Sequence, residues 1–267
     1  MSAVDTTFET LRTQGQKAFL PFVTAGDPNL EFTGKVLKEL VARGANLCEL
    51  GIPYSDPIAD GPVIQASYTR VLEQKQKLAH ILEAAEIWTA ELSAPIVSMV
   101  SYSIIHRQGL ENYVARAKAA GIAGAIVPDL LVEESAAFSE ICRREDFSLI
   151  QLVTPTTPRD RALQICETST GFLYFVSVTG ITGERTELPP EVVDQVGWLK
   201  DRTNLPICIG FGISQPEHVR MLAPVADGLI VGSAIVRKIA EVEEKGEAAV
   251  LAEIGTLVDE LTSAINS

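Results

Sequence analysis

The sequence predicts an α/β fold, because short apolar runs alternate along it with amphipathic stretches. Eight of the runs are nearly continuous in apolar residues, which is typical of parallel strands that are covered on both faces. They are Ala18–Thr24, Asn46–Gly51, Pro95–Val100, Gly124–Pro128, Ser148–Val153, Gly171–Ser177, Pro206–Gly210 and Gly228–Gly232. No GxGxxG motif follows the first run, which disfavours an open doubly wound sheet. Eight such units predict a single-domain (β/α)8, or TIM, barrel over residues 1–267.

The stretches between these runs have helical periodicity, and several carry start and stop signals. Asp27-Pro28-Asn29 precedes the first of them and Gly121 follows the third. The predicted helices are Leu30–Arg43, Leu78–Leu92, Leu110–Ala120, Val132–Arg144, Arg159–Cys166, Pro190–Asp201 and Gln215–Leu222. We also expect an extra N-terminal helix over Val4–Thr13 and a closing helix over Glu247–Ile265.

Composition limits the function classes. The net charge of -13 argues against nucleic acid and anionic membranes as partners. The N-terminus lacks the basic and apolar regions of a signal peptide, and no apolar run reaches the length of a membrane span. The cysteines are not spaced as CxxC, so we interpret them as reduced residues of a cytoplasmic protein: Cys48, Cys142, Cys166 and Cys208.

The most informative residue is Glu49, a carboxylate inside the second apolar run, at the barrel end where active sites lie. A buried carboxylate is costly unless it is paired or protonated, and burial raises its pKa toward the range of a general acid or base. The alternative is a Glu that a neighbouring group satisfies. Asp60 in the following loop is the best second carboxylate, whereas Asp56 and Asp129 are interpreted as turn or capping residues.

The ends of the last strands indicate a phosphate site. Glycine-rich turns after strands seven and eight allow backbone N–H groups to approach an anion, although they could also be plain tight turns. The candidates are Gly183, Gly212, Gly232 and Ser233. An apolar pocket for a flat group is predicted from side chains at or near strand ends: Phe22, Ile126, Tyr174 and Phe211.

Other chemistries are disfavoured by the positions of lysine and histidine. No lysine stands at a strand end, where a Schiff-base aldolase needs one. His80, His106 and His218 are far apart in the sequence, which disfavours a metal aldolase. Carboxylate acid–base catalysis without cofactor or metal remains.

Six segments resemble the tryptophan synthase alpha chain family, in the right order and over almost the whole chain. They are Pro21–Asn29, Glu49–Gln65, Val127–Ser135, Phe175–Arg185, Gly210–Val219 and Ala226–Val236. The resemblance implies a TIM barrel that cleaves indole-3-glycerol phosphate into indole and glyceraldehyde 3-phosphate without cofactor or metal.

The resemblance also implies residue roles. Glu49 would protonate indole C3 and then assist the glycerol hydroxyl, and Asp60 would hydrogen-bond the indole N–H. Tyr174 and Thr182 would position these carboxylates. The remaining roles are indole contact by Phe22 and Phe211, and phosphate binding by Gly183, Gly212, Gly232 and Ser233.

The partner that the resemblance implies is the tryptophan synthase beta chain, a pyridoxal-phosphate enzyme that would dock on the rim that includes Pro53–Pro57. Three positions depart from the family pattern. Ser103-Ile104 stands where many relatives carry Asn-Pro, Leu131 replaces a usual Pro, and Lys75 or a neighbour replaces a Gly. The first two predict altered partner affinity. Three functions therefore stay open: a beta-dependent alpha subunit, a stand-alone lyase that releases indole, and a weakly catalytic activating subunit.

Overall fold

The computed structural model describes residues 1–58, 60–177, 190–210 and 212–266, and within them nine parallel strands form one sheet. Its strand order is β5-β4-β3-β2-β1-β9-β8-β7-β6. The strands are β1 Ala18–Thr24, β2 Cys48–Gly51, β3 Ile96–Met99, β4 Ile122–Ile126, β5 Ser148–Ile150, β6 Leu152–Val153, β7 Leu173–Val176, β8 Ile207–Gly210 and β9 Gly228–Val231.

The sheet is a barrel, because its two end strands are consecutive in the chain. β5 pairs with β4 and β6 pairs with β7, and only Gln151 separates β5 from β6. The predicted run Ser148–Val153 is therefore one barrel position that is divided in two, and the eight-unit barrel is confirmed. The fourth strand begins two residues earlier than predicted, at Ile122, and ends at Ile126.

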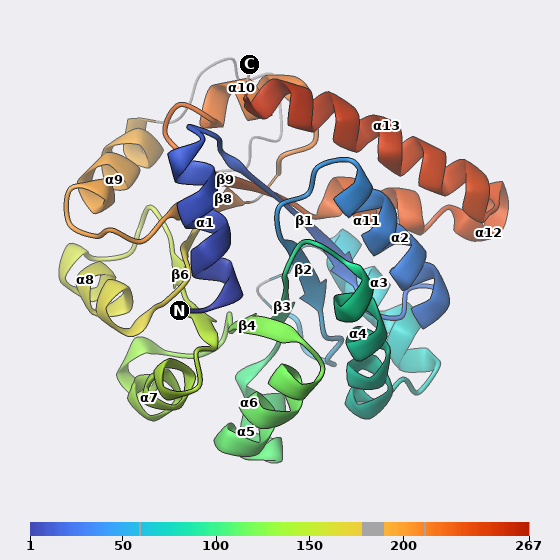
Figure 1. The fold of residues 1–267 in the computed structure, drawn as a ribbon, viewed down its shortest axis with the longest axis horizontal. Helices are drawn as coiled ribbons and strands as arrows, with labels where there is room; N and C mark the ends of the chain where they lie inside the picture. Colours follow the sequence, from blue (N-terminus) through green and yellow to red (C-terminus); the bar gives the residue numbers. More distant parts are fainter. Residues whose placement is uncertain (59, 178–189, 211, 267) are drawn as a thin grey trace.

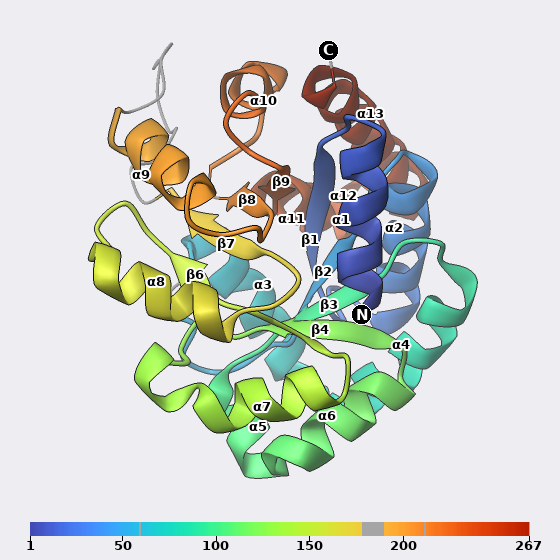
Figure 2. The same cartoon turned by 60° about the vertical axis from the view of Figure 1, so that its left-hand side comes forward.

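Helices surround the ring of strands (Figures 1 and 2). Those predicted from the sequence are present with small shifts: α1 Ala3–Thr13, α2 Leu30–Ala42, α4 Leu78–Glu91, α6 Leu110–Ala119, α8 Arg159–Thr168, α9 Pro190–Lys200, α10 Pro216–Leu222 and α13 Glu247–Ile265. The predicted helix Val132–Arg144 is divided at Ser135 into a 3-10 turn, Val132–Glu134, and α7 Ala136–Arg144. The described residues also form helices that we did not predict: α3 Pro62–Glu73, α5 Tyr102–Gln108, α11 Ser233–Ile239 and α12 Val242–Lys245.

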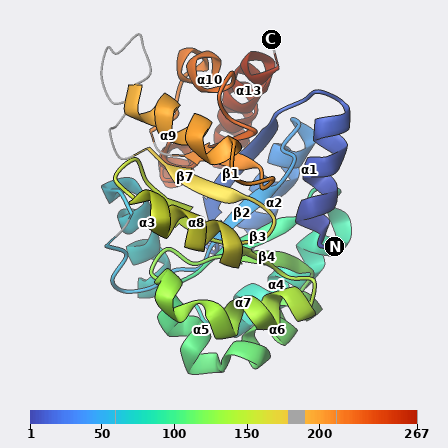
Figure 3. The same ribbon diagram turned by 90° about the vertical axis from the view of Figure 1, so that its left-hand side faces the viewer.

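The apolar side chains form two clusters, one between strands and helices and one inside the barrel. Val4, Phe8 and Leu11 of α1 belong to the inner cluster, and the Phe8 ring lies 5.6 Å from that of Phe172. Figure 3 shows α1 at one side of the ring of strands and α3 at the opposite side. α1 therefore closes one end of the barrel and leaves the carboxyl ends of the strands to α3 and the βα loops.

Two smaller sequence predictions can be compared with the fold. All four cysteines are free, and Cys48, Cys142 and Cys208 are buried, as expected of reduced core residues. Lys75, which follows α3, has a φ of +56°, a conformation that favours glycine. This supports its interpretation as the replacement of a glycine. None of the described helices is both long and apolar enough to cross a membrane.

Candidate active site

Glu49 points into the barrel because of its place in strand β2. Side chains alternate along a strand, and Cys48 and Leu50 on either side belong to the outer cluster, while Leu47 belongs to the inner one. The Glu49 side chain is 0% exposed, and neither carboxylate oxygen has a hydrogen-bond partner among the described residues. The interpretation of Glu49 as a structural Glu satisfied by a neighbour is therefore not supported.

Burial also sets the protonation state of Glu49. Desolvation raises the pKa of this carboxyl well above its usual value, because the charged form loses its hydration and gains no described partner in exchange. A carboxyl with such a pKa keeps its proton near neutral pH and can donate it to a substrate. Glu49 pairs in register with Phe22 of β1 and with Val97 of β3, which fixes its height in the barrel.

Asp60 is the second carboxyl of the site and lies just before α3. Burial raises its pKa to about 6, and a hydrogen bond with the Tyr54 hydroxyl opposes part of that shift. Its Oδ2 atom is buried and has no hydrogen-bond partner among the described residues. Asp60 is therefore mostly ionised at neutral pH, so the two carboxyls have opposite protonation states there.

A cavity of about 340 Å³ opens beside Asp60 at the carboxyl ends of the strands. Its volume suits a small metabolite. Much of the lining is apolar and comes from strand ends and the loops that follow them, including Met99, Val127, Leu130, Leu152, Tyr174 and Val176. Of the four residues predicted to line an apolar pocket, Tyr174 lines this cavity. Phe22 and Ile126 are buried with Tyr174 in the inner cluster. Phe211 lies outside the described residues.

Two glycines make room for aromatic side chains at the ends of their strands. A Cβ atom at Gly51 would lie 2.4 Å from Cζ of Phe22 and 2.8 Å from the hydroxyl of Tyr68. A Cβ atom at Gly210 would lie 2.5 Å from the hydroxyl of Tyr174. Since real Cβ atoms do not come so close to other heavy atoms, both positions require glycine.

The predicted phosphate turns are partly described. Gly212 has a φ of +80°, which other residues rarely adopt, so the tight-turn interpretation holds for it as well. Gly232 immediately precedes α11, whose first residue is Ser233. The first backbone N–H groups of a helix have no acceptor within the helix and are suited to bind an anion. A Cβ atom at Gly232 would lie 3.4 Å from Cβ of Phe22, which places this turn next to β1. Thr182 and Gly183 lie outside the described residues.

The comparisons with known proteins agree with this geometry. The model of the tryptophan synthase alpha chain family matches residues 8–266. A tryptophan synthase alpha chain of Rhodopirellula baltica is 56% identical over 263 residues, which are 97% of this chain and 95% of that protein. One from Arabidopsis thaliana is 42% identical, over 98% of this chain and 94% of that protein. The crystal structure of the alpha subunit from Legionella pneumophila superposes with a TM-score of 0.90 at 34% identity, over 99% and 98% of the two chains.

This chain belongs to the tryptophan synthase alpha chain family. The alpha chain cleaves indole-3-glycerol phosphate to indole and glyceraldehyde 3-phosphate, so the chain is a lyase of tryptophan biosynthesis.

Other buried polar groups of the barrel were not predicted from the sequence. The side chains of Thr24, Tyr68 and Gln151 are buried, and each has an oxygen without a hydrogen-bond partner among the described residues: Oγ1, Oη and Oε1. Gln151 could have been noticed as a polar residue inside a predicted strand. Tyr68 carried no such signal, because its helix was not predicted.

Other polar residues that the sequence analysis considered form local hydrogen bonds. Asp129 accepts hydrogen bonds from the Ser101 hydroxyl and the Tyr102 backbone N–H at the start of α5, so the capping prediction is confirmed. Asp56 accepts a hydrogen bond from the Ser55 hydroxyl in an exposed loop. Nδ1 of His218 accepts a hydrogen bond from the Ser214 backbone N–H, and the described residues contain no cluster of potential metal ligands.

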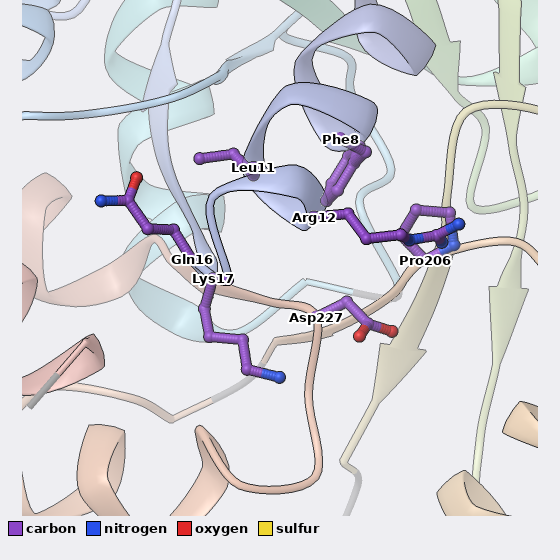
Figure 4. Close-up of a pocket in the computed structure, with 8 residues that line it drawn as sticks. Phe8, Leu11, Arg12, Gln16, Lys17, Pro206 and Asp227 are labelled. Atoms are coloured by element: carbon purple, nitrogen blue, oxygen red, sulfur yellow. The ribbon is translucent and has the colours of Figure 1, made fainter.

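A second cavity, of about 160 Å³, lies at the opposite end of this alpha chain barrel (Figure 4). It is lined by residues of α1 and by residues just before strands, among them Phe8, Lys17, Pro206 and Asp227. This is the amino-terminal end of the barrel, where residues serve stability in TIM barrels rather than catalysis. Of these two cavities, the one beside Asp60 is therefore the candidate active site.

Proposed function

We propose that Glu49 and Asp60 carry out the retro-aldol cleavage of indole-3-glycerol phosphate in this chain, which acts as one catalytic domain over residues 1–267. The observation that carries the proposal is the Glu49 carboxyl, which is fully buried and faces the barrel interior without a described hydrogen-bond partner. A raised pKa supports proton donation by this group, and an ionised Asp60 beside the cavity supports charge stabilisation.

In the proposed reaction Glu49 first donates a proton and then takes one back. Glu49 gives its proton to C3 of the indole, which places a positive charge on the ring nitrogen, and Asp60 accepts a hydrogen bond from that N–H. The bond between C3 and the glycerol carbon then breaks, and its electron pair returns to the ring. The hydroxyl on that carbon becomes the aldehyde oxygen as the Glu49 carboxylate takes its proton. Glu49 ends protonated, so no external acid, base or oxidant is needed.

The other candidates would hold the substrate. Phe22, Ile126 and Phe211 would contact the indole, and Tyr174 and Thr182 would position the carboxyls. The buried Tyr174 hydroxyl over Gly210 and the inner location of Phe22 and Ile126 support this arrangement. Phosphate binding is assigned to Gly183, Gly212, Gly232 and Ser233. For Phe211, Thr182 and Gly183 the proposal rests on the resemblance alone.

A tryptophan synthase beta chain is the proposed partner, in an alpha2beta2 assembly in the cytoplasm. A solved tryptophan synthase complex from Pyrococcus furiosus has a chain that superposes with a TM-score of 0.83 at 36% identity, over 93% of this chain. The partner would dock on the rim that includes Pro53–Pro57. Ser103 and Ile104 belong to α5, and Leu131 is 54% exposed and lines the cavity beside Asp60. These departures from the family pattern lie on that rim, so we propose that they weaken the complex. A titration that gives nanomolar binding to a beta chain would contradict this weakening.

Indole release from indole-3-glycerol phosphate tests the proposal. We expect slow release by the purified chain, a rise by orders of magnitude with a beta chain, and loss of release in Glu49→Gln. Glu140→Gln, an exposed change on α7, is the matched control and should keep its activity. Fast release without a beta chain would identify a stand-alone lyase, and no release under either condition would refute the proposed role of this site.

A further inference from the structure

Tyr68 is a buried phenol whose hydroxyl the proposed mechanism does not use. It lies on α3, immediately after the Asp60 loop, and is 1% exposed. Its hydroxyl oxygen is buried and has no hydrogen-bond partner among the described residues. A buried hydroxyl without a partner is unfavourable in the free protein, and phenylalanine would fill the same space without that cost. The hydroxyl therefore needs an explanation outside the fold.

This hydroxyl lies near the carboxyl end of β2, the strand that carries Glu49. It lies 2.8 Å from the position that a Cβ atom would take at Gly51, two residues after Glu49 on β2. Cε2 of the Phe22 ring lies 2.7 Å from the same Cβ position. The Tyr68 ring packs against that of Tyr54 at a centroid distance of 5.6 Å. Tyr54 is also the residue whose hydroxyl interacts with Asp60.

The surrounding charges fix the state of the phenol. Burial raises the pKa of Tyr68 well above its usual value, and the charge of Asp60 adds to that shift. Tyr68 therefore stays a neutral hydrogen-bond donor at every working pH. The Tyr68 hydroxyl therefore lies beside the end of the strand that carries Glu49, and the charge of Asp60 acts on it.

We propose that Tyr68 is a substrate-binding and specificity-determining residue, whose hydroxyl hydrogen-bonds a hydroxyl of the glycerol chain. This inference rests on the proposed function, since it assumes that the cavity beside Asp60 binds a substrate with an indole ring, a hydroxylated three-carbon chain and a phosphate. A site that contains a hydrogen-bonding group for a substrate hydroxyl discriminates against an analogue without that hydroxyl. Tyr68 therefore selects the glycerol chain over a plain propyl chain.

The test compares two ligands in Glu49→Gln protein, which binds without turnover. One is indole-3-glycerol phosphate and the other is the same molecule with a propyl chain that lacks both hydroxyls. We expect Tyr68→Phe to weaken binding of the glycerol compound about tenfold. Binding of the propyl compound should change less than about twofold, because that compound offers no hydroxyl to Tyr68. Isothermal titration measures both dissociation constants.

Tyr113→Phe is the matched control. Tyr113 is equally buried on α6, but its hydroxyl is hydrogen-bonded to Ser98 at 2.8 Å and its ring belongs to the outer cluster. This variant should lose thermal stability and keep the ratio of the two dissociation constants. Tyr68→Phe should melt no lower than its parent, because its hydroxyl has no described partner to lose.

The outcomes separate this inference from the proposed function. If Tyr68→Phe weakens the binding of both ligands equally, or of neither, the specificity role is refuted. The proposed function still stands in that case, provided that the protein with Glu49 intact releases indole. Absence of indole release from the protein with Glu49 intact would instead refute the proposed function. The same Tyr68→Phe change with Glu49 present should raise KM for the glycerol substrate more than it changes kcat.

Discussion

Glu49 and Asp60 show how far a single residue can be interpreted before its surroundings are known. A Glu between Leu47 and Leu50 in an apolar run indicates a buried acid from sequence alone. The structure adds that its carboxyl faces inward and has no described hydrogen-bond partner. Asp60 was predicted with less support from the residues, because a loop Asp is commonly a turn residue. Its burial depends on Tyr54 and on the helix that follows, which composition does not reveal.

The raised pKa of Asp60 has a consequence for stability. Its pKa rises from 3.8 in the unfolded chain to about 6 in the fold. Between these values the unfolded chain has released the proton that the folded one retains, so stability falls as pH rises and is constant above about pH 6. Asp60→Asn removes this titration. We expect the variant to gain about 3 kcal/mol over the parent between pH 3.8 and pH 6, from the size of the shift.

Urea unfolding at a series of pH values measures this difference. The exposed change Asp56→Asn, four residues away in the same loop, is the control for removal of one charge. A difference between Asp60→Asn and the parent that stayed constant from pH 3.8 to pH 6 would contradict the assigned shift.

At the scale of elements, α3 positions the catalytic loop and is itself held by an ion pair. Asp27, whose side chain is 1% exposed, accepts hydrogen bonds from Nε and Nη2 of Arg70 at 2.9 and 2.6 Å. The Ser67 hydroxyl also donates to Asp27, at 2.6 Å. These contacts join the loop after β1 to α3, which begins two residues after Asp60. Asp27 is thus more than part of the helix start signal that the sequence suggests.

Removal of Arg70 should disturb both stability and turnover. Arg70→Met leaves the Asp27 carboxylate buried with Ser67 as its remaining described side-chain partner, and we expect a loss of about 2–4 kcal/mol, since Arg70 is partly exposed. Indole release should fall as α3 shifts. Arg144→Met, which removes only exposed ion pairs, is the control and should cost less than about 1 kcal/mol. Equal unfolding midpoints for the two variants would refute a structural role for the Arg70 pair.

The helices and contacts that could not be predicted from the sequence have physical explanations. α5 and α11 are seven residues each and begin two or three residues after the preceding strand ends, so their helical periodicity does not stand out from that strand. α10 has the same length but begins six residues after β8 ends, and it was predicted. α3 buries Ser67 and Tyr68 beside Ile64 and Val71, so its inner face does not read as an apolar stripe. The Asp27–Arg70 pair joins residues 43 apart, and no local pattern specifies such a contact.

At the scale of the whole molecule, the barrel was predictable because its strands are buried on both faces and repeat along the chain. Eight runs identified the strands well, although their ends shifted by up to two residues. The division of one run at Gln151 was not predictable, because it reflects where the two end strands meet their neighbours. The N-terminal helix was expected, but its place inside the end of the barrel was not.

That helix stabilises the barrel from the end opposite the site. Phe8 is 5% exposed and packs on Phe172, so Phe8→Ala should cost about 3 kcal/mol and lower Tm by roughly 6–12 °C. Indole release at a temperature where the variant is folded should match the parent, because Phe8 lies far from Glu49. Glu9→Ala, an exposed change on the same helix, is the control. Calorimetry measures Tm and the release assay measures activity. A large loss of activity in the folded variant would contradict the conclusion that this helix contributes to stability and not to catalysis.

The close approach of Phe22 and Tyr68 to Gly51 has a consequence for how this pocket can evolve. Any side chain at Gly51 collides with both rings at once, so no single replacement there can reshape the pocket. A smaller residue at Phe22 or Tyr68 alone opens a void that the glycine cannot fill. The three positions are therefore coupled, and a side chain at Gly51 is expected to require compensating changes at Phe22 and Tyr68.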